Sequence, residues 1–491
     1  MKIPRVPPTA RHVVLALPLL IFGLARFYQL GAESFWLDEA KGALLALAPF
    51  SGWWEELPAH QTPPGHFLLL RLLSLFSIED GFLRFPSALA GLFSIPLVWW
   101  IASQVMRFNQ CDSQDVKPSW WVALWFAVAP FHFHFSREAR CYTIWLLLEL
   151  IVVAVLLAQT KHSNSRRLPF LLGLLFPLPL FFHYHAAWFA LGRLPWLVML
   201  FLAMTRGGKT QVIVGLMLSS LLTVPFLLHQ ALSIPPANPN AITGLGELGI
   251  GFWLRKSGEI FGFPYPLQVI AVLLVGLAAI SLMNRLLPSR GDRYPADKLD
   301  KKPFNCVWVL SILVPAVGIL ATLLLTNRYV AARHFFPVLP LLLIEAGRGL
   351  YLLIRFAGGQ RAKEVFGILA VLPVIFWGNV VLENWTEVDR PPWRVIAFYL
   401  DAKANEQTKF IAVGDNVHVL NYYRTTRGHS YQLFYDTPSG NAEPLGAMGV
   451  VLSGKDRGAL EWRNGLRDNG RVPEQVWKSK RIAEIEYYSL E

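Results

Sequence analysis

Two acidic side chains stand next to each other soon after the first apolar stretch of the chain. Asp38 and Glu39 follow Phe35 and Trp36 in the segment SFWLDEAKGALL. A carboxylate held between an apolar cover and water can act as a general base toward an incoming hydroxyl group. The same acids could instead stabilise the first turn of a helix that begins near Ser34, because the N-terminus of a helix favours negative charge. The local sequence supports both interpretations.

Arginine side chains gather in a second short segment, FHFHFSREARCYTIW, which contains Arg137, Arg140 and Tyr142. A guanidinium group offers a rigid fork of donors that matches the oxygens of a phosphate. Arg137 and Arg140 could therefore hold a lipid-linked phosphate, or they could be anchors whose charged ends reach the membrane surface. Arg333, which precedes His334 in ARHFFP, is a further phosphate candidate because it lies deeper than an anchor needs.

Histidines flank a tyrosine in the segment FFHYHAAW, which holds His183, Tyr184 and His185 at the end of another apolar stretch. Two histidines separated by one residue do not face the same way on a helix, so a metal site built from these two alone is not expected. These side chains could line a cavity, or they could provide hydrogen bonds at a helix end.

Helices that cross a membrane must position these groups. Hydrophobic residues make up 54% of the 491-residue chain and charged residues 16%. Apolar runs of about 20 residues recur, and only helices satisfy the backbone of such runs in hydrocarbon. We expect about eleven transmembrane helices, near residues 11–30, 85–106, 120–135, 141–158, 168–182, 186–204, 211–228, 267–287, 307–325, 335–354 and 365–382. Arg26 and Arg193 fall inside these spans, so each should face the protein interior or reach an interface.

Positive charge in the short loops predicts the orientation. Lysine and arginine are frequent in the N-terminal tail and in four loops, at residues 161–167, 205–209, 284–302 and 355–363. These segments should face the cytoplasm, so Arg137 and Arg140 fall on the outer side, where arginine is less favoured. That placement favours the phosphate role. Much of the formal charge of +12 then belongs to the cytoplasmic loops, where it can contact anionic membrane lipids. No nucleic-acid partner is therefore expected.

The chain should contain two domains. Residues 1–383 are expected to form the transmembrane domain, with external loops at 31–84 and 229–266. Residues 384–491 should form a small extracytoplasmic α/β domain, because strand-like segments alternate with helix-like ones there. The predicted fold is thus a polytopic α-helical membrane protein of the inner (plasma) membrane, with its N-terminus in the cytoplasm. Its three cysteines, Cys111, Cys141 and Cys306, are scattered, so no disulfide framework is expected.

Strands are expected in the segments KFIAVG, GAMGVVLSG and RIAEIEYY of the C-terminal domain. Helices are expected in the segments PPWRVIAFYLDAKA, NVHVLNYYR and ALEWRNGLRD. No glycine-rich phosphate loop occurs in this part of the sequence, so no nucleotide role is assigned to it.

Six segments resemble a known family in their order along the chain. They are SFWLDEA, TPPGHFLLLRLLSLF, GFLRFPSALAGLFSIPLVWWIA, SREARCY, HYHAAW and ARHFFPVLPLLL. From about Ser34 to Leu350 the chain resembles bacterial membrane glycosyltransferases of the GT-C fold, related to protein O-mannosyltransferases and lipid A aminoarabinose transferases. RPPWRVIAFYL also resembles the start of the external tail that many members carry.

The resemblance implies an inverting transfer of a sugar from a polyprenyl-phosphate donor, reached from the outer leaflet, to a lipid, glycan or protein acceptor. It implies that Asp38 is the catalytic base and that Glu39 supports it. Three further residues would bind the donor phosphate, namely Arg140, Tyr142 and Arg333. His183 and Tyr184 match a family element expected to line the cavity.

One segment departs from the family pattern. Many relatives have an acid just before the Pro-Pro of the first external loop, where this chain has His60 and Gln61 in HQTPPG. We include both among the candidate substrate-binding residues. Two side chains of this kind hold a hard cation poorly, so no metal ligand is assigned and a divalent cation is the one cofactor left open. The replacement of the more usual Arg-Tyr by Arg333 and His334 is a smaller change, and His334 is also included among the candidate substrate-binding residues.

Two other classes of function fit parts of the sequence. A flippase or transporter of lipid-linked sugars would also contain many spans and buried arginines, but internal repeats are more typical of transporters and none is evident here. A scaffold for the external domain would not need acids and arginines on one face. The enzyme interpretation requires Asp38, Arg140 and Arg333 to converge on one outward-opening chamber.

Overall fold

The computed structural model covers all 491 residues. It describes residues 8–57, 62–108, 118–163, 165–233, 268–286, 301–326, 332–357, 359–386, 392–404, 408–414, 419–427, 432–435, 447–453, 464, 466, 471–477 and 485–489. Most of the expected loop 229–266, most of the expected helix ALEWRNGLRD, and both His60 and Gln61 lie outside these residues.

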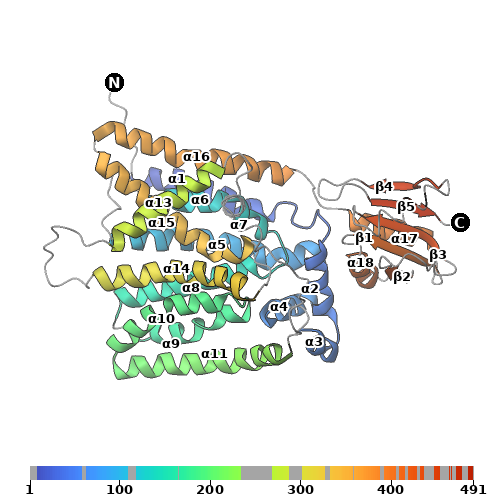
Figure 1. Cartoon of the computed structure of the whole chain (residues 1–491), viewed down its shortest axis with the longest axis horizontal. Helices are drawn as coiled ribbons and strands as arrows, with labels where there is room; N and C mark the ends of the chain where they lie inside the picture. Colours follow the sequence, from blue (N-terminus) through green and yellow to red (C-terminus); the bar gives the residue numbers. More distant parts are fainter. Residues whose placement is uncertain are drawn as a thin grey trace. The chain divides into compact units, whose positions relative to one another are not determined.

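Helices are found at all of the expected spans (Figure 1). They are α1 (Pro8–Leu24), α5 (Asp80–Phe108), α6 (Pro118–Val128), α7 (Pro130–Phe135), α8 (Tyr142–Lys161), α9 (Leu168–Leu175), α10 (Ala186–Ala203), α11 (Arg206–Ser233), α13 (Gln268–Leu286), α14 (Lys301–Thr326), α15 (Leu339–Ala357) and α16 (Gly359–Thr386). In the described part of the chain, six helices are long and apolar enough to cross a membrane and five apolar helices are shorter. The protein is therefore a multi-pass membrane protein. The number of spans and the direction of the termini stay predictions.

Proline divides one of the expected spans. The segment 120–135 forms two helices, because Pro130 lacks a backbone donor and begins α7 after Ala129, which has an extended backbone. α7 is short, and the turn that follows it ends at Cys141, where α8 begins. This break places the turn that contains Arg140 directly before the N-terminus of α8.

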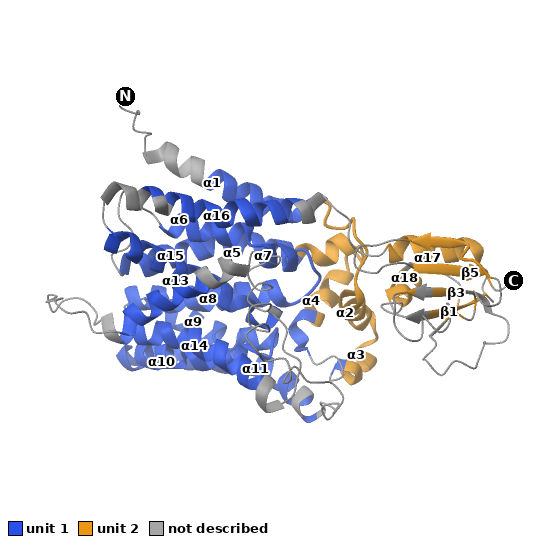
Figure 2. Cartoon of the chain, turned by 45° about the horizontal axis from the view of Figure 1, so that its top comes forward, with its two compact units in different colours: residues 1–28, 57–66, 86–383 blue, residues 29–56, 67–85, 384–491 orange. Residues whose placement is uncertain are grey.

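The chain folds into two compact units, each made of segments that are separated in the sequence (Figure 2). Unit 1 comprises residues 1–28, 57–66 and 86–383, and unit 2 comprises residues 29–56, 67–85 and 384–491. Parts of the first external loop thus cluster with the C-terminal segment. The expected boundary at residue 384 separates the transmembrane part of the chain from the external part, which is a different division from that into the two units. The boundary stays a prediction.

Close helix packing holds unit 1 together. A Cβ atom added at Gly173 of α9 would lie 2.1 Å from the carbonyl oxygen of Val212 in α11, and one at Gly349 of α15 would lie 2.1 Å from that of Leu277 in α13. Only glycine permits such an approach, which is typical of helices packed in a membrane. Large aromatic side chains such as Trp196 fill the interior between the helices.

Unit 2 contains a five-stranded mixed sheet and several short helices. The strands are β1 (Lys409–Gly414), β2 (Gln432–Tyr435), β3 (Ala447–Ser453), β4 (Gln475–Trp477) and β5 (Ile485–Ser489). Their order is β2-β1-β3-β5-β4, with β1 parallel to both β2 and β3, and β5 antiparallel to β3 and β4. The helices are α2 (Leu37–Leu47), α3 (Phe50–Glu56), α17 (Trp393–Lys403) and α18 (Val419–Arg427), together with most of α4 (Pro64–Ser74). The predicted C-terminal sheet is confirmed at β1, β3 and β5, whereas β2 and β4 were not predicted.

Candidate active site

Two arginines share one tyrosine ring in unit 1. The guanidinium carbon of Arg140 lies 5.6 Å from the ring centroid of Tyr142, and that of Arg333 lies 5.8 Å from the same centroid. Arg140 Nη2 also donates a hydrogen bond to the Tyr142 hydroxyl, at 3.4 Å. Both arginines are half-buried and Tyr142 is buried. The structure therefore brings together the three residues predicted to bind phosphate.

Three histidines lie beside this cluster. The ring of His183 lies 5.8 Å from that of Tyr142 and 5.5 Å from that of His334, and the rings of His185 and His334 are 4.6 Å apart. The backbone N–H of His185 donates to Nδ1 of His183 at 3.2 Å just before α10 begins, which agrees with the alternative of hydrogen bonding at a helix end. Tyr184 lies half-buried in the same turn.

The histidines of this turn are neutral at ordinary pH. Burial lowers the pKa of His183 well below its usual value, and the nearby His334 and His185 lower it further. Burial also lowers the pKa of His185 to about 4. His183 and His185 can therefore give and accept hydrogen bonds but add no charge. The positive charge of the cluster belongs to its two arginines.

A buried ion pair supports the cluster from inside the bundle. Trp145 stacks on His183 with ring centroids 4.1 Å apart and an angle of 9° between the planes. Its indole N–H donates to Glu149 Oε1 at 2.8 Å, and the other carboxylate oxygen of Glu149 accepts from Arg193. Glu149 and Arg193 are both buried. Arg193 thus faces the protein interior, as expected for a charge inside a span, and its pair fixes the indole that packs on His183.

Neighbouring helices hold the turn that carries Arg140. Ser87 of α5 donates its hydroxyl to the carbonyl oxygen of Arg140, at 3.1 Å. Nε2 of the buried His66 lies 3.0 Å from the carbonyl oxygen of Ala139. The backbone before α8 is therefore fixed by side chains from α4 and α5, which limits the positions open to Arg140.

Arg137 has different neighbours from Arg140. Its Nη1 donates to the carbonyl oxygen of Tyr28 at 2.7 Å, and its guanidinium carbon lies 5.5 Å from the ring centroid of Phe133. Cationic side chains favour such carbonyl groups near a helix C-terminus. These contacts support a structural role at the end of the first helix, and phosphate binding by Arg137 stays a prediction.

The two adjacent acids of unit 2 differ in their surroundings. Glu39 is fully buried, and its two oxygens accept hydrogen bonds of 2.8 Å from Nε and Nη2 of Arg84. Its Oε2 also lies 3.3 Å from the backbone nitrogen of Trp36, the residue before α2, as in half of a capping box. Glu39 thus stabilises the start of α2, while its catalytic assignment stays a prediction. Asp38, in the same first turn, is only half-buried.

The convergence of Asp38 with Arg140 and Arg333 stays a prediction, because Asp38 belongs to unit 2 and the arginines belong to unit 1. The roles of His60 and Gln61 also stay predictions, since both lie outside the described residues. Among the residues that the structure does describe, no group of three or more histidine, cysteine or acidic side chains could hold a metal ion. The donors around Tyr142 are cationic or neutral, and they fit an anion better than a divalent cation.

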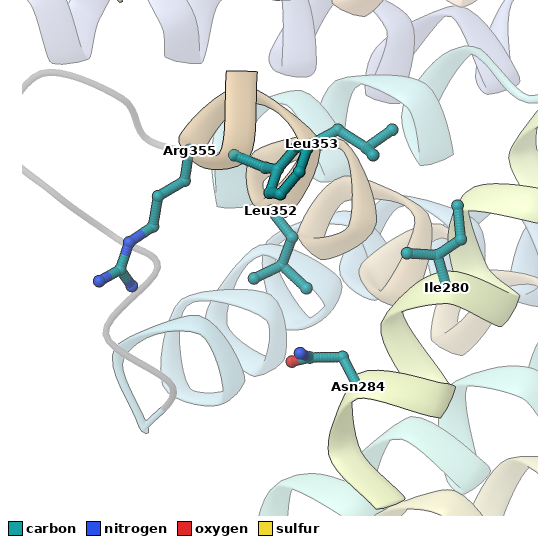
Figure 3. Close-up of a pocket in the computed structure, with 6 residues that line it drawn as sticks. Ile280, Asn284, Leu352, Leu353 and Arg355 are labelled. Carbon is teal, nitrogen blue, oxygen red and sulfur yellow. The ribbon is translucent and has the colours of Figure 1, made fainter. Parts of the chain in front are cut away.

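A cavity of about 550 Å³ lies elsewhere in unit 1 (Figure 3). Its lining comes from α13 and α15 and includes Ile280, Asn284, Leu353 and Arg355. Arg355 is 16 residues beyond the start of α15, which corresponds to about 24 Å along the helix. Arg333 precedes that helix. The cavity is thus far from the arginine cluster, and we assign it no part in the chemistry.

Sequence reasoning missed several residues that support the site, among them His66, Arg84, Trp145 and Glu149. One signal was available. Glu149 is an acid in the middle of the apolar segment 141–158, and Arg193 is a cation inside another apolar segment, so a pair between them would have satisfied both charges. His66 carried no comparable signal, because a single histidine near a helix start has many ordinary roles.

Comparisons with known proteins concern the fold. No protein-family model matches the sequence, and no curated protein matches it. The structure of ArnT from Cupriavidus metallidurans in the apo state matches with a TM-score of 0.60 and 13% identity, over 98% of each chain. ArnT from the same organism bound to undecaprenyl phosphate matches with a TM-score of 0.57 and 14% identity, also over 98% of each chain.

A more distant match is the Archaeoglobus fulgidus oligosaccharyltransferase in complex with zinc and sulfate. Its TM-score is 0.50 at 10% identity, and the match covers 88% of this chain and 67% of the other. ArnT, an aminoarabinose transferase, and this oligosaccharyltransferase are both GT-C fold glycosyltransferases. The chain therefore has the GT-C fold that its sequence resemblance predicted.

Proposed function

We propose that this protein is an inverting glycosyltransferase that moves a sugar from a polyprenyl-phosphate donor to a hydroxyl of a lipid, glycan or protein acceptor on the outer face of the membrane. The observation that carries the proposal is the pair of guanidinium groups, from Arg140 and Arg333, that both pack against the ring of one buried tyrosine, Tyr142. The fold supports it, because ArnT shares that fold and one of its structures contains undecaprenyl phosphate.

The arginine pair suits the departing group of such a reaction. As the bond between the sugar carbon and the phosphate oxygen breaks, the phosphate gains negative charge. Arg140 and Arg333 would stabilise that charge most strongly near the transition state, which lowers the barrier. The Tyr142 hydroxyl can donate a further hydrogen bond to the phosphate, and neutral His183 can line the adjoining space.

Asp38 would supply the base. Its carboxylate would take the proton of the acceptor hydroxyl while the acceptor oxygen bonds to the sugar carbon from the side opposite the phosphate. A single displacement of this kind inverts the configuration at that carbon. Glu39 would act indirectly, because its pairing with Arg84 fixes the first turn of α2. The proposal requires Asp38 and the two arginines to act on one donor molecule.

The test is Asp38→Asn in purified full-length protein, assayed with a panel of undecaprenyl-phosphate monosaccharides and membrane extract as acceptor. Loss of a general base typically costs about 10²- to 10⁴-fold in rate, so we expect transfer to fall by that amount while undecaprenyl phosphate still binds. Glu55→Gln is the matched control, because Glu55 is an exposed acid on α3. It should keep wild-type transfer.

Two results would contradict the proposal. Undiminished transfer by Asp38→Asn would exclude this carboxylate as the base. If the wild-type protein transfers no sugar but moves labelled lipid-linked sugar across vesicle membranes, the chain is a flippase and not a transferase.

A further inference from the structure

A second buried acid in unit 2 joins the C-terminal segment to the first external loop. Asp80, which begins α5, is buried, and its Oδ2 accepts hydrogen bonds from Arg394 Nη2 and, at 2.6 Å, from the Tyr423 hydroxyl. Arg394 lies in the first turn of α17 and Tyr423 lies in α18. Two helices of the C-terminal segment therefore meet on one carboxylate from α5.

The same two residues also hold the backbone that leads into α2. The Tyr423 hydroxyl accepts a hydrogen bond of 2.7 Å from the backbone N–H of Phe35. Arg394 Nη2 donates to the carbonyl oxygen of Gly31 at 3.1 Å, and the backbone N–H of Arg394 donates to the Ser34 hydroxyl at 3.2 Å. Three hydrogen bonds thus run from this pair to the segment from Gly31 to Phe35, which immediately precedes α2.

Aromatic packing reinforces the contact. The ring of Phe35 lies 5.1 Å from that of Tyr422, and both side chains are buried. The Tyr422 hydroxyl donates to the carbonyl oxygen of Ile78 at 3.0 Å. Burial, followed by the charge of Asp80, raises the pKa of Tyr423 above its usual value. Tyr423 therefore keeps its proton and continues to donate to Asp80.

One helix links this contact to the acids of α2. Asp80 and Arg84 are four residues apart on α5, so they lie on the same face. Arg84 pairs with Glu39 and donates to the carbonyl oxygens of Glu33 and Ser34, at 2.8 and 3.1 Å. The backbone before α2 is consequently held by Arg84 from α5 and by Arg394 and Tyr423 from the C-terminal segment.

We infer that Arg394 and Tyr423 are positioning residues for Asp38: together with Asp80 they fix the segment from Gly31 to Phe35, and hence the first turn of α2 that carries the proposed base. The inference rests on the proposed function, because it assigns Asp38 the catalytic role. An error of about 1 Å in the position of a catalytic group can cost about 10²-fold in rate. The C-terminal segment therefore contributes to turnover by holding the backbone before α2.

The test compares Arg394→Ala and Tyr423→Phe with Lys403→Ala in the full-length protein. Lys403 is on the same helix as Arg394, and it forms an ion pair with Glu474 between two partly exposed side chains. The control therefore breaks an ion pair of the same domain that does not reach the first loop. Arg394→Lys is added because it keeps the charge next to Asp80.

Three quantities are measured for each variant: kcat for sugar transfer, the Kd for undecaprenyl phosphate, and hydrogen–deuterium exchange of the amides from Gly31 to Ala40. We expect Arg394→Ala and Tyr423→Phe to lower kcat about 10- to 100-fold with an unchanged Kd. The Phe35 amide should exchange faster in both variants. Lys403→Ala should match the wild type, and Arg394→Lys should recover part of the rate. A loss of folding would instead weaken donor binding as well.

The outcomes separate this inference from the proposed function. Wild-type kcat in Tyr423→Phe, which removes a single hydroxyl group and should fold, would overturn the positioning role and leave the transferase intact. An equal loss of kcat in Lys403→Ala would overturn it too, because the effect would not be specific to the contact with the first loop. Unchanged exchange at Phe35 would show that the contact does not hold the segment. Absence of transfer from the wild type would instead refute the proposed function, and the exchange data alone would still decide whether the domain fixes the segment before α2.

Discussion

Arg333→Ala is the substitution that tests the proposed phosphate site most directly. The Arg333 side chain is half-buried, and its guanidinium carbon lies 5.8 Å from the ring centroid of Tyr142. Among the described residues, its buried Nε has no hydrogen-bond partner. A buried donor of this kind is costly unless a ligand satisfies it. An anion bound beside Arg333 would satisfy this donor, as the proposed phosphate site requires.

The expected size of the effect follows from one charge-assisted hydrogen bond. Such a bond contributes about 1.5 to 3 kcal/mol, which corresponds to roughly 10- to 150-fold in rate. Because the phosphate gains charge as it leaves, most of the loss should fall on kcat and little on the Kd for the undecaprenyl-phosphate monosaccharide donor. Arg333→Lys keeps the charge but loses the planar fork, so its kcat should lie between those of the wild type and Arg333→Ala.

The assay measures initial rates of sugar transfer and, without acceptor, equilibrium binding of the undecaprenyl-phosphate monosaccharide donor on the same preparations. Arg166→Ala serves as the matched control, since Arg166 is an exposed arginine in the loop after α8. Its kcat and Kd should equal those of the wild type. An Arg333→Ala variant with wild-type kcat would refute the reasoning. So would a variant whose only defect is a weaker Kd, because the interaction would then exist equally in the ground state.

Three further outcomes are expected. Glu149→Gln leaves Arg193 buried without its charged partner, so the free energy of unfolding should fall by about 3 to 5 kcal/mol. The double variant Glu149→Gln with Arg193→Met should recover much of this loss. Thermal denaturation in detergent compares the two variants. Because the pKa of His185 is lowered to about 4 in the folded protein, the unfolded chain takes up its proton first as the pH falls. Stability should therefore decline between about pH 6.5 and 4, and less so in His185→Gln, as followed by thermal denaturation across that range. Incubation with EDTA should leave the transfer rate unchanged, and recovery of a lost rate by added Mg²⁺ or Mn²⁺ would contradict this.

Local patterns in the sequence predicted many of the elements of the fold. Apolar runs placed a helix at each expected span, and strand-like segments located β1, β3 and β5. β2 and β4 are only four and three residues long, which is too short for a pattern to stand out. The grouping of residues 29–56 and 67–85 with residues 384–491 was also not predicted, because it depends on contacts between residues far apart in the sequence.

Partners of the charged residues were the hardest feature to predict. Arg140, Tyr142 and Arg333 could be grouped because the family resemblance assigned them one ligand. Asp80 and Arg394 are 314 residues apart, and nothing in the sequence of either segment indicates that the two side chains pair. Hydrophobic periodicity reports which face of an element is buried, but it does not report what that face meets. Pairings of this kind therefore follow only from the coordinates.

Burial explains why neighbouring residues of the same type can have different tasks. Adjacent residues on a helix point about 100° apart, so Asp38 and Glu39 meet different surroundings although they share the first turn of α2. Glu39 is fully buried, and both its oxygens accept hydrogen bonds from Arg84. Asp38 is half-buried, which leaves part of its side chain accessible to an acceptor hydroxyl. This difference supports the proposed assignment of Asp38 as the base and of Glu39 as the support for the turn that holds it.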